Sequence, residues 1–310
     1  MGVKASARAG KGRPGKGTDQ AIRGRGQASL WPGQETVSHG AFPPATSIVD
    51  SARSPEARPR VRQNRQQRVL QDFLMAESLL AVTLAEGVGS DRELEAALTE
   101  KLPQNSLETR ARYAQSILRW FFADGPDGFA SQVWRAYRDE SMQRDILRVL
   151  YLQAEPIVGD CVAQALYPLA DGMTIPGTFF DGFLARRLGS AEIPANTRKR
   201  LKTNLGKLGF LVRSKVHGDR LSSVNSTKTA FLLLLHHLFA PEEPRTIELS
   251  RLFADRFWKY LGIKSEDVVR AILRSADISR SIGKYVVADQ LEQITTCYSV
   301  KELLSQRVIL

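Results

Sequence analysis

Apolar residues recur at helical spacing along most of the chain after residue 68. Ile117 and Phe121 lie four positions apart on one such stripe, and Ser90 followed by Glu93 forms the Ser-x-x-Glu capping box of a helix N-terminus. Short stretches rich in Gly, Asp and Pro separate the stripes, as expected of turns between helices. The pattern therefore predicts an all-helical first domain over residues 69–172.

Two further helices are predicted downstream of this domain. The first, "TFFDGFLARRL", covers residues 178–188, and the second, "TRKRLKTNLGKL", follows Asn196 as its expected N-cap. In the second helix Leu201, Leu205 and Leu208 share one narrow face, which we expect to be buried. The Lys and Arg residues on the other side of this helix should then point outward.

The residues after this helix have the pattern of a β-hairpin. "FLVRSKV" alternates apolar and polar positions, "HGD" places Gly218 in a turn, and "RLSSV" supplies a returning strand. Helix, turn, helix and hairpin together predict a winged-helix-like unit over residues 173–225. The second helix of such a unit fits the major groove of B-DNA, and its hairpin lies along the adjacent phosphates.

The last third of the chain is predicted to be a helical region over residues 226–310. "STKTAFLLLLHHLF" forms an apolar helix with Ser226 as the expected cap, and two amphipathic helices are expected to start near Thr246 and Ser265. Residues 283–304 fit either a hairpin or another pair of helices. The fold class expected for the whole chain is mainly α.

The charge of the chain is concentrated near its N-terminus. The net charge is +11, and residues 1–68 hold 13 Lys and Arg against 4 Asp and Glu. This segment is rich in Gly, Pro, Ser and Arg and has few aliphatic residues, so we expect a disordered basic tail. Such a tail either contacts nucleic-acid phosphates without sequence preference or is a solvated extension, including sequence translated upstream of a start at Met75.

The basic helix and hairpin supply the candidate binding residues, because a duplex would neutralise like charges that are crowded on one element. Their Lys and Arg side chains suit phosphates and guanine edges, and their Asn and Thr side chains suit hydrogen bonds to bases or phosphates. The candidates are Asn196, Arg198, Lys199, Arg200, Lys202, Thr203, Lys207, Arg213, Lys215 and Arg220. Asn204 is a further candidate for a contact with a base edge or a phosphate.

Several other classes of protein lack support in the sequence. No catalytic motif is present, and the adjacent His236 and His237 point in different directions on a helix without a third ligand, so neither an enzyme nor a metal site is expected. Cys161 and Cys297 lack partners with metal-site spacing, which favours reduced thiols in the cytoplasm. The longest apolar run, residues 230–235, is too short to span a membrane. We expect no cofactor.

The order of the helices resembles the BrxA family of bacteriophage exclusion (BREX) systems. The matching stretches include "TRARYAQSILRWFF", "NTRKRLKTNLGKLGFL", "TKTAFLLLLHHLF" and "LSRLFADRFWKYLGIKSEDVVRAIL", and the likeness covers about residues 75–305. It implies a helical domain similar to the antiterminator NusB beside a winged-helix-like unit. It also implies binding to double-stranded DNA and action beside a methyltransferase, an ATPase and a phosphatase-like component. The long basic tail departs from the family pattern.

Two other functions fit the same residues. A winged-helix transcription regulator would protect one promoter, whereas the resemblance implies binding to arbitrary duplex DNA. An RNA-binding or protein-docking scaffold, built on the first helical domain, would be separated from both by competition between duplex DNA and structured RNA.

Overall fold

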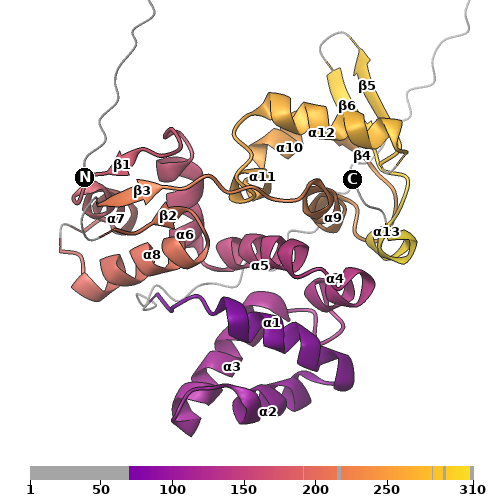
Figure 1. The fold of residues 1–310 in the computed structure, drawn as a ribbon. Helices are drawn as coiled ribbons and strands as arrows, with labels where there is room; N and C mark the ends of the chain where they lie inside the picture. The colour runs from indigo at the N-terminus through magenta and orange to yellow at the C-terminus, as the bar shows by residue number, and fades with distance from the viewer. Residues whose placement is uncertain (1–69, 191, 215–217, 281, 289–290, 308–310) are drawn as a thin grey trace, which may run out of the picture. The chain divides into compact units, whose positions relative to one another are not determined.

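The structure is a computed structural model that describes most of the chain from residue 70 onward. The positions outside it are 1–69, 191, 215–217, 281, 289–290 and 308–310. The basic tail predicted over residues 1–68 therefore lies outside the described residues. The part of the chain that the structure describes is mainly helical and includes two small antiparallel sheets (Figure 1).

The first part of the described chain is helical, as predicted. Its helices are α1 (Met75–Leu84), followed by a 3₁₀ turn at Ala85–Gly87, α2 (Asp91–Lys101), α3 (Leu107–Phe121), α4 (Phe129–Tyr137) and α5 (Glu140–Ala154). Ser90 caps α2 by accepting a hydrogen bond from the backbone N–H of Glu93 at 3.3 Å. The Glu93 carboxylate accepts from the N–H of Gly89 instead of that of Ser90, so only half of the expected capping box forms.

The second part contains the predicted pair of helices and the hairpin, together with a strand that the sequence pattern did not predict. Its elements are α6 (Pro156–Asp160), a π-helical segment at Cys161–Leu166, β1 (Thr174–Ile175), α7 (Phe179–Leu188), α8 (Ala195–Lys207), β2 (Leu211–Val212) and β3 (Asp219–Leu221). The strands form one antiparallel sheet in the order β1-β3-β2. A strand of two residues is too short to produce an alternating pattern, which explains why β1 was missed.

One detail of the predicted second helix is wrong. α8 begins at Ala195 with Pro194 as its N-cap, and no side chain caps it. Asn196 lies inside the first turn and is exposed. Proline lacks a backbone N–H and suits the entry to a helix, so the helix starts two residues earlier than the preference of Asn for the N-cap suggests.

The last part contains a second three-stranded sheet. Its elements are α9 (Lys228–Phe239), β4 (Thr246–Glu248), α10 (Leu249–Ala254), α11 (Phe257–Tyr260), α12 (Glu266–Ile278), β5 (Lys284–Ala288), β6 (Leu291–Thr295) and α13 (Val300–Gln306). The strand order is β4-β6-β5. The open question over residues 283–304 is resolved as a hairpin, β5–β6, followed by the start of a helix, α13.

Two expected helix starts in this part are wrong. Thr227 caps α9 by accepting from the N–H of Ala230 at 3.2 Å, whereas the Ser226 hydroxyl donates to Asp145 at 3.1 Å. Thr246 begins the strand β4, and the helix starts three residues later. Ser265 caps α12 as expected. No helix among the residues described has the length and apolar character needed to cross a membrane.

The two sheets share one order of connections. In each, a strand is followed by helices, then by a hairpin whose second strand lies between the other two. The helix directly before the hairpin is α8 in the first sheet unit and α12 in the second. This repetition is not predicted from the sequence, because the two segments share connectivity rather than a visible motif.

Helix α5 joins the three parts. It packs against α1, α3 and α4, against α6, and against α9 and α11 of the last part. Arg148 on α5 donates to the carbonyl oxygen of Leu208, just after α8, at 2.9 Å. Asp145 accepts from the N–H of Thr227, at the start of α9, at 2.9 Å. Helix α5 therefore fixes the end of α8 and the beginning of α9.

Candidate nucleic-acid interface

The buried face of α8 is the leucine face that the sequence predicts. Leu201 and Leu205 are fully buried and Leu208 is nearly so. Helix α8 packs against β2 and against α6 and α7. Burial of three leucines fixes the rotation of the helix about its own axis, so the direction of every other side chain on α8 follows from it.

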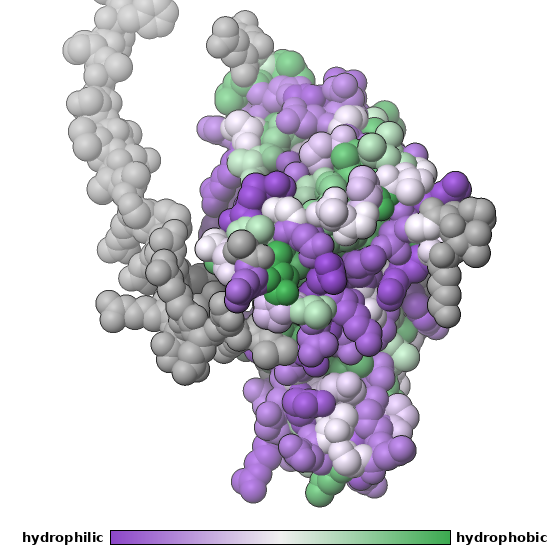
Figure 2. All heavy atoms as spheres, turned by 90° about the vertical axis from the view of Figure 1, so that its left-hand side faces the viewer, coloured by the Kyte–Doolittle hydropathy of each residue, from purple (hydrophilic) through white to green (hydrophobic). Residues whose placement is uncertain are grey.

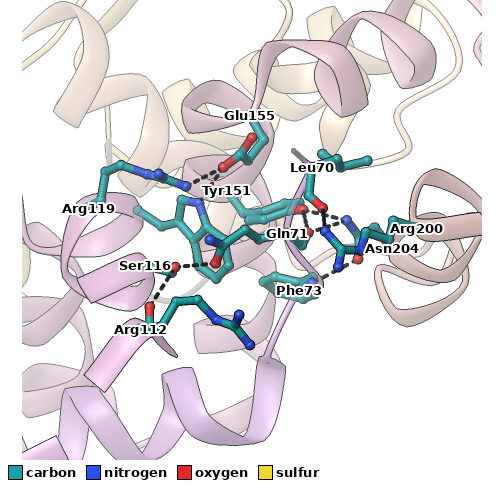
Figure 3. A network of polar contacts seen from close by, with 11 residues as sticks. Leu70, Gln71, Phe73, Arg112, Ser116, Arg119, Tyr151, Glu155, Arg200 and Asn204 are labelled. Atoms are coloured by element: carbon teal, nitrogen blue, oxygen red, sulfur yellow. Dashed lines mark hydrogen bonds and ion pairs between the residues drawn. The ribbon is translucent and has the colours of Figure 1, made fainter. Parts of the chain in front are cut away.

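A second face of α8 holds the extended segment that precedes α1. Arg200 Nη1 donates to the carbonyl oxygen of Leu70 at 2.8 Å (Figure 3). Lys207 Nζ donates to the carbonyl oxygen of Phe73 at 2.9 Å. The expectation that these cations point outward without a partner is therefore wrong for Arg200, which is partly buried, whereas Lys207 stays exposed although it donates to a carbonyl. The physical reason is that a segment about 130 residues away in sequence covers this flank of the helix, and its backbone carbonyls need hydrogen-bond donors.

Asn204, between those two cations, is fully buried and cannot reach a base. Its side-chain oxygen accepts from the N–H of Phe73 at 2.8 Å. Its amide nitrogen donates to the carbonyl oxygen of Gln71 and to the hydroxyl of Tyr151, each at 2.8 Å. Burial raises the pKa of Tyr151 well above its ordinary value, so its hydroxyl keeps its proton. The predicted base or phosphate contact by Asn204 is thus wrong, and the residue has a structural role.

This polar network continues into the first helices (Figure 3). The Ser116 hydroxyl on α3 donates to the Gln71 side chain and to the carbonyl oxygen of Arg112. On the far side of Tyr151, the Glu155 carboxylate accepts from Arg119 at 2.6 Å. The contacts link α3, α5, α8 and residues 70–73, so they position α8 rather than offer it to a ligand.

The outer face of α8 is narrower than predicted. It consists of Asn196, Lys199, Thr203 and Gly206, of which Asn196 and Lys199 are exposed and the other two are partly exposed. Lys199 has no ion pair or hydrogen bond within the part of the chain described here. This face carries no carboxylate and no large apolar side chain, so its chemistry suits an anionic and polar partner.

Three further cations beside this face are paired with carboxylates. Arg198 contacts both carboxylate oxygens of Asp181 on α7, at 2.7 and 2.9 Å. Lys202 Nζ lies 2.5 Å from Oδ2 of Asp219 on β3, and Arg213 Nε lies 3.9 Å from Oδ1 of the same carboxylate.

Arg213 extends the outer face from the hairpin side. Its guanidinium donates to the Thr203 hydroxyl at 3.3 Å, and its aliphatic stem lies 3.5 Å from the position that a Cβ of Gly206 would take. The absence of a side chain at Gly206 lets Arg213 lie across the helix. Lys202, Thr203 and Arg213 are therefore brought together, with Lys199 on the same outer surface.

Two predicted residues do not join this group. Arg220 is exposed, but successive residues of a strand point to opposite faces of the sheet, and its neighbour Asp219 faces α8. Arg220 therefore faces away from α8, beside Val212 and Thr174 on the neighbouring strands. Lys215 lies outside the described residues.

Figure 2 views the molecule from the side on which β1, α7 and α8 lie in Figure 1. Hydrophilic residues cover most of this face, and the apolar residues on it form small, separate spots. A polar surface of this kind favours a solvated partner such as a phosphate backbone over an apolar protein surface.

Sequence reasoning missed the acidic partners Asp181 and Asp219. Asp181 lies 17 residues from Arg198, and Asp219 lies 17 residues from Lys202, so no local spacing rule identifies these pairs. Asp219 is the single acidic residue in the basic stretch 196–221, and that isolation was the available signal.

The other groups with candidate chemistry are structural in character. Asp160 accepts from Arg187 at 2.6 Å and is also paired with Arg256, which joins α6 to α7 and to the segment before α11. Burial raises the pKa of the Cys161 thiol, which stays protonated. His236 is buried and its Nδ1 lies 2.8 Å from the carbonyl oxygen of Leu232. His237 stacks on Phe129.

No three side chains of His, Cys, Asp or Glu are grouped as metal ligands among the positions that the structure covers. Comparison with protein-family models, with curated proteins and with solved structures finds no match.

Proposed function

We propose that the chain binds double-stranded DNA through α8 and the β2–β3 hairpin, as a non-enzymatic protein of the cytoplasm with low sequence specificity. The connections of α6, β1, α7, α8, β2 and β3, with the last strand in the middle of the sheet, support this proposal. Winged-helix modules have this order, and the helix before their hairpin is the one that enters the major groove. Helix α8 occupies that place.

The charge of α8 carries the proposal. The helix contains five cations and no carboxylate between Ala195 and Lys207. Two of the cations, Arg200 and Lys207, donate to neutral backbone carbonyls, which fixes their position without cancelling their charge. The helix therefore keeps a positive potential that attracts phosphates, even though its outer face is narrower than the sequence predicts.

Low specificity follows from the composition of the outer face. Lys199 and Arg213 suit phosphates, whose contacts orient a protein on the duplex without distinguishing its sequence. Asn196 and Thr203 are the polar side chains of the outer face that remain for base edges. Two short side chains give little discrimination, since one good bidentate contact contributes roughly 1–3 kcal/mol.

The biological setting that we propose is bacteriophage exclusion. This part of the proposal depends on the resemblance of the helical stretches to the BrxA family, together with the mainly helical character of the described residues. In that setting the chain would be a DNA-binding accessory of the system's methyltransferase, ATPase and phosphatase-like components. Loss of phage resistance on deletion of its gene, restored by the wild-type chain, would support this setting; unchanged resistance would exclude it.

The binding proposal is tested with Lys199→Ala and the matched control Lys301→Ala. Both lysines are exposed on helices, but Lys301 lies on α13, away from the proposed surface. Because one phosphate contact is lost, Lys199→Ala should weaken binding to a labelled 20-base-pair duplex by roughly three- to tenfold and lower the salt slope by about one. Lys301→Ala should match the wild type.

The same titration separates the rival functions. Equal effects of the two substitutions would remove α8 from the interface. A preference for structured RNA over the duplex would favour the RNA-binding scaffold, and strong preference for one duplex sequence would favour the transcription regulator. The wild-type chain should bind unrelated duplexes with affinities that rise with length, because longer DNA offers more overlapping sites.

A further inference from the structure

The carboxylates of Asp181 and Asp219 occupy three of the cations around the proposed DNA surface. Asp219 lies between Lys202 and Arg213, and only 12% of its side chain is exposed. Asp181 holds Arg198 with both of its oxygens. Neither residue belongs to the outer face itself, and neither is part of a group of metal-ligating side chains among the residues described.

We infer that Asp181 and Asp219 limit the affinity of this surface for nucleic acid, because a phosphate must displace them to reach Arg198, Lys202 and Arg213. The inference rests on the proposed DNA binding and concerns the regulation of that same site. A phosphate oxygen and a carboxylate oxygen compete for the same donors. Removal of the carboxylate charge makes those donors available.

Among the cations of this surface, only those paired with Asp181 and Asp219 are neutralised by a carboxylate within the described residues. Arg200 and Lys207 donate to neutral backbone carbonyl oxygens of the buried residues Leu70 and Phe73, so no carboxylate neutralises them. Lys199 is already available among the residues described. The cations whose availability can change are therefore those paired with Asp181 and Asp219, and Asp219 controls two of them.

The last part of the chain has a similar ion pair between the helix before its hairpin and the central strand of its sheet, with additional carboxylates around the cation. Arg270 on α12 lies 2.9 Å from Glu292 on β6, the central strand of its sheet, just as Lys202 on α8 contacts Asp219 on β3, the central strand of the other. Arg270 is also paired with Glu266 and Asp267. Three carboxylates surround this cation, so α12 has much less positive charge available for binding a phosphate than α8 has.

The experiment compares Asp219→Asn and Asp181→Asn with the control Asp171→Asn in the full chain. Asp171 pairs with the exposed Lys264 at 2.7 Å, so the control removes the same charge from a surface pair that lies outside α8 and the β2–β3 hairpin. Binding to a labelled 20-base-pair duplex is followed by fluorescence anisotropy from 50 to 300 mM NaCl. Thermal unfolding of each variant is measured in parallel.

We expect Asp219→Asn to bind roughly three- to tenfold more tightly than the wild type, with a salt slope steeper by up to about two, because two cations become available. Asp181→Asn should give a smaller gain, with a slope steeper by up to about one. Asp171→Asn should bind like the wild type. A gain shared by all three variants would indicate total charge alone and would overturn the inference.

Two further outcomes keep the test decisive. Folded Asp219→Asn and Asp181→Asn proteins whose affinity is unchanged or lower than that of the wild type would refute the inference while leaving DNA binding intact. If Asp219→Asn does not fold, the surface variant Asp181→Asn decides alone. Absence of duplex binding by the wild-type chain would instead refute the proposed function.

Discussion

The surroundings of Asn204 determine whether this residue binds a ligand or supports the fold. A polar side chain in a basic helix suggests a contact with a base, but the same amide group also suits a backbone that needs both a donor and an acceptor. Here it provides both, to Phe73 and Gln71, and it contacts the hydroxyl of Tyr151 as well. A buried amide with three partners is a structural residue, since each group left unpaired would carry a desolvation cost.

Substitution of Asn204 by Ala should therefore lower the free energy of unfolding by about 2–4 kcal/mol, because buried groups of Phe73, Gln71 and Tyr151 lose a partner. Chemical denaturation measures this change. Asn196→Ala, at an exposed position on the same helix, should change it by less than about 0.5 kcal/mol. Equal stability of the two variants would show that the network around residues 70–73 contributes little.

At the scale of elements, periodicity predicts which face of a helix is buried. It does not predict which other element covers the remaining faces. The spacing of Leu201, Leu205 and Leu208 predicted the buried face of α8 correctly, and the turn at Gly218 predicted the β2–β3 hairpin. No rule of spacing predicts that residues 70–73 cover one flank of α8, or that Asp219 faces Lys202. Part of the predicted site therefore lies on the outer surface, whereas four of its cations have partners that are distant in sequence, and Arg220 faces away from α8.

The comparison of α8 with α12 shows why the order of elements alone does not define a function. Both helices stand before a hairpin in sheets of the same strand order. The first has five cations and no acidic residue, whereas the second begins with Glu266 and Asp267 and carries two arginines. Charge distinguishes the two units, so the proposal of DNA binding belongs to the first.

Helix α9 gives a pH prediction at the element scale. Burial lowers the pKa of His236 below its ordinary value near 6.5, so the folded chain keeps this residue neutral while the unfolded chain takes up a proton. The stability that depends on the neutral ring is present above pH 6.5 and is lost as the pH falls below it, because the unfolded state then binds more protons.

The free energy of unfolding should thus fall by up to about 2 kcal/mol from pH 7.5 to pH 5 through this residue. Urea denaturation of the wild type and of His236→Leu at both pH values measures it, and the variant should show the smaller difference. The other histidines are common to both proteins and cancel in the comparison. An identical pH dependence would mean that His236 binds a proton equally well in the folded and in the unfolded chain.

At the scale of the whole molecule, α5 connects the proposed DNA-binding unit to the rest of the described chain. Asp145 on this helix is paired with Arg148 at 2.7 Å and accepts from Ser226 and Thr227 at the start of α9. Arg148 in turn donates to Leu208 after α8. Burial lowers the pKa of the Arg148 guanidinium, and the neighbouring Asp145 opposes that effect. The pair holds α8 and α9 to one helix.

Asp145→Ala should consequently destabilise the chain by about 3–5 kcal/mol, because it leaves the mostly buried charge of Arg148 without its counterion and the N–H of Thr227 without an acceptor. Asp127→Ala is the matched control, since Asp127 pairs with Arg135 but is 84% exposed, and its loss should cost less than about 1 kcal/mol. Denaturation measures both values. Hydrogen exchange should show faster opening at α8 and at the start of α9 in the first variant, because both lose their attachment to α5. Unchanged protection there would show that the leucine face of α8 and the apolar face of α9 hold these helices without the polar pair.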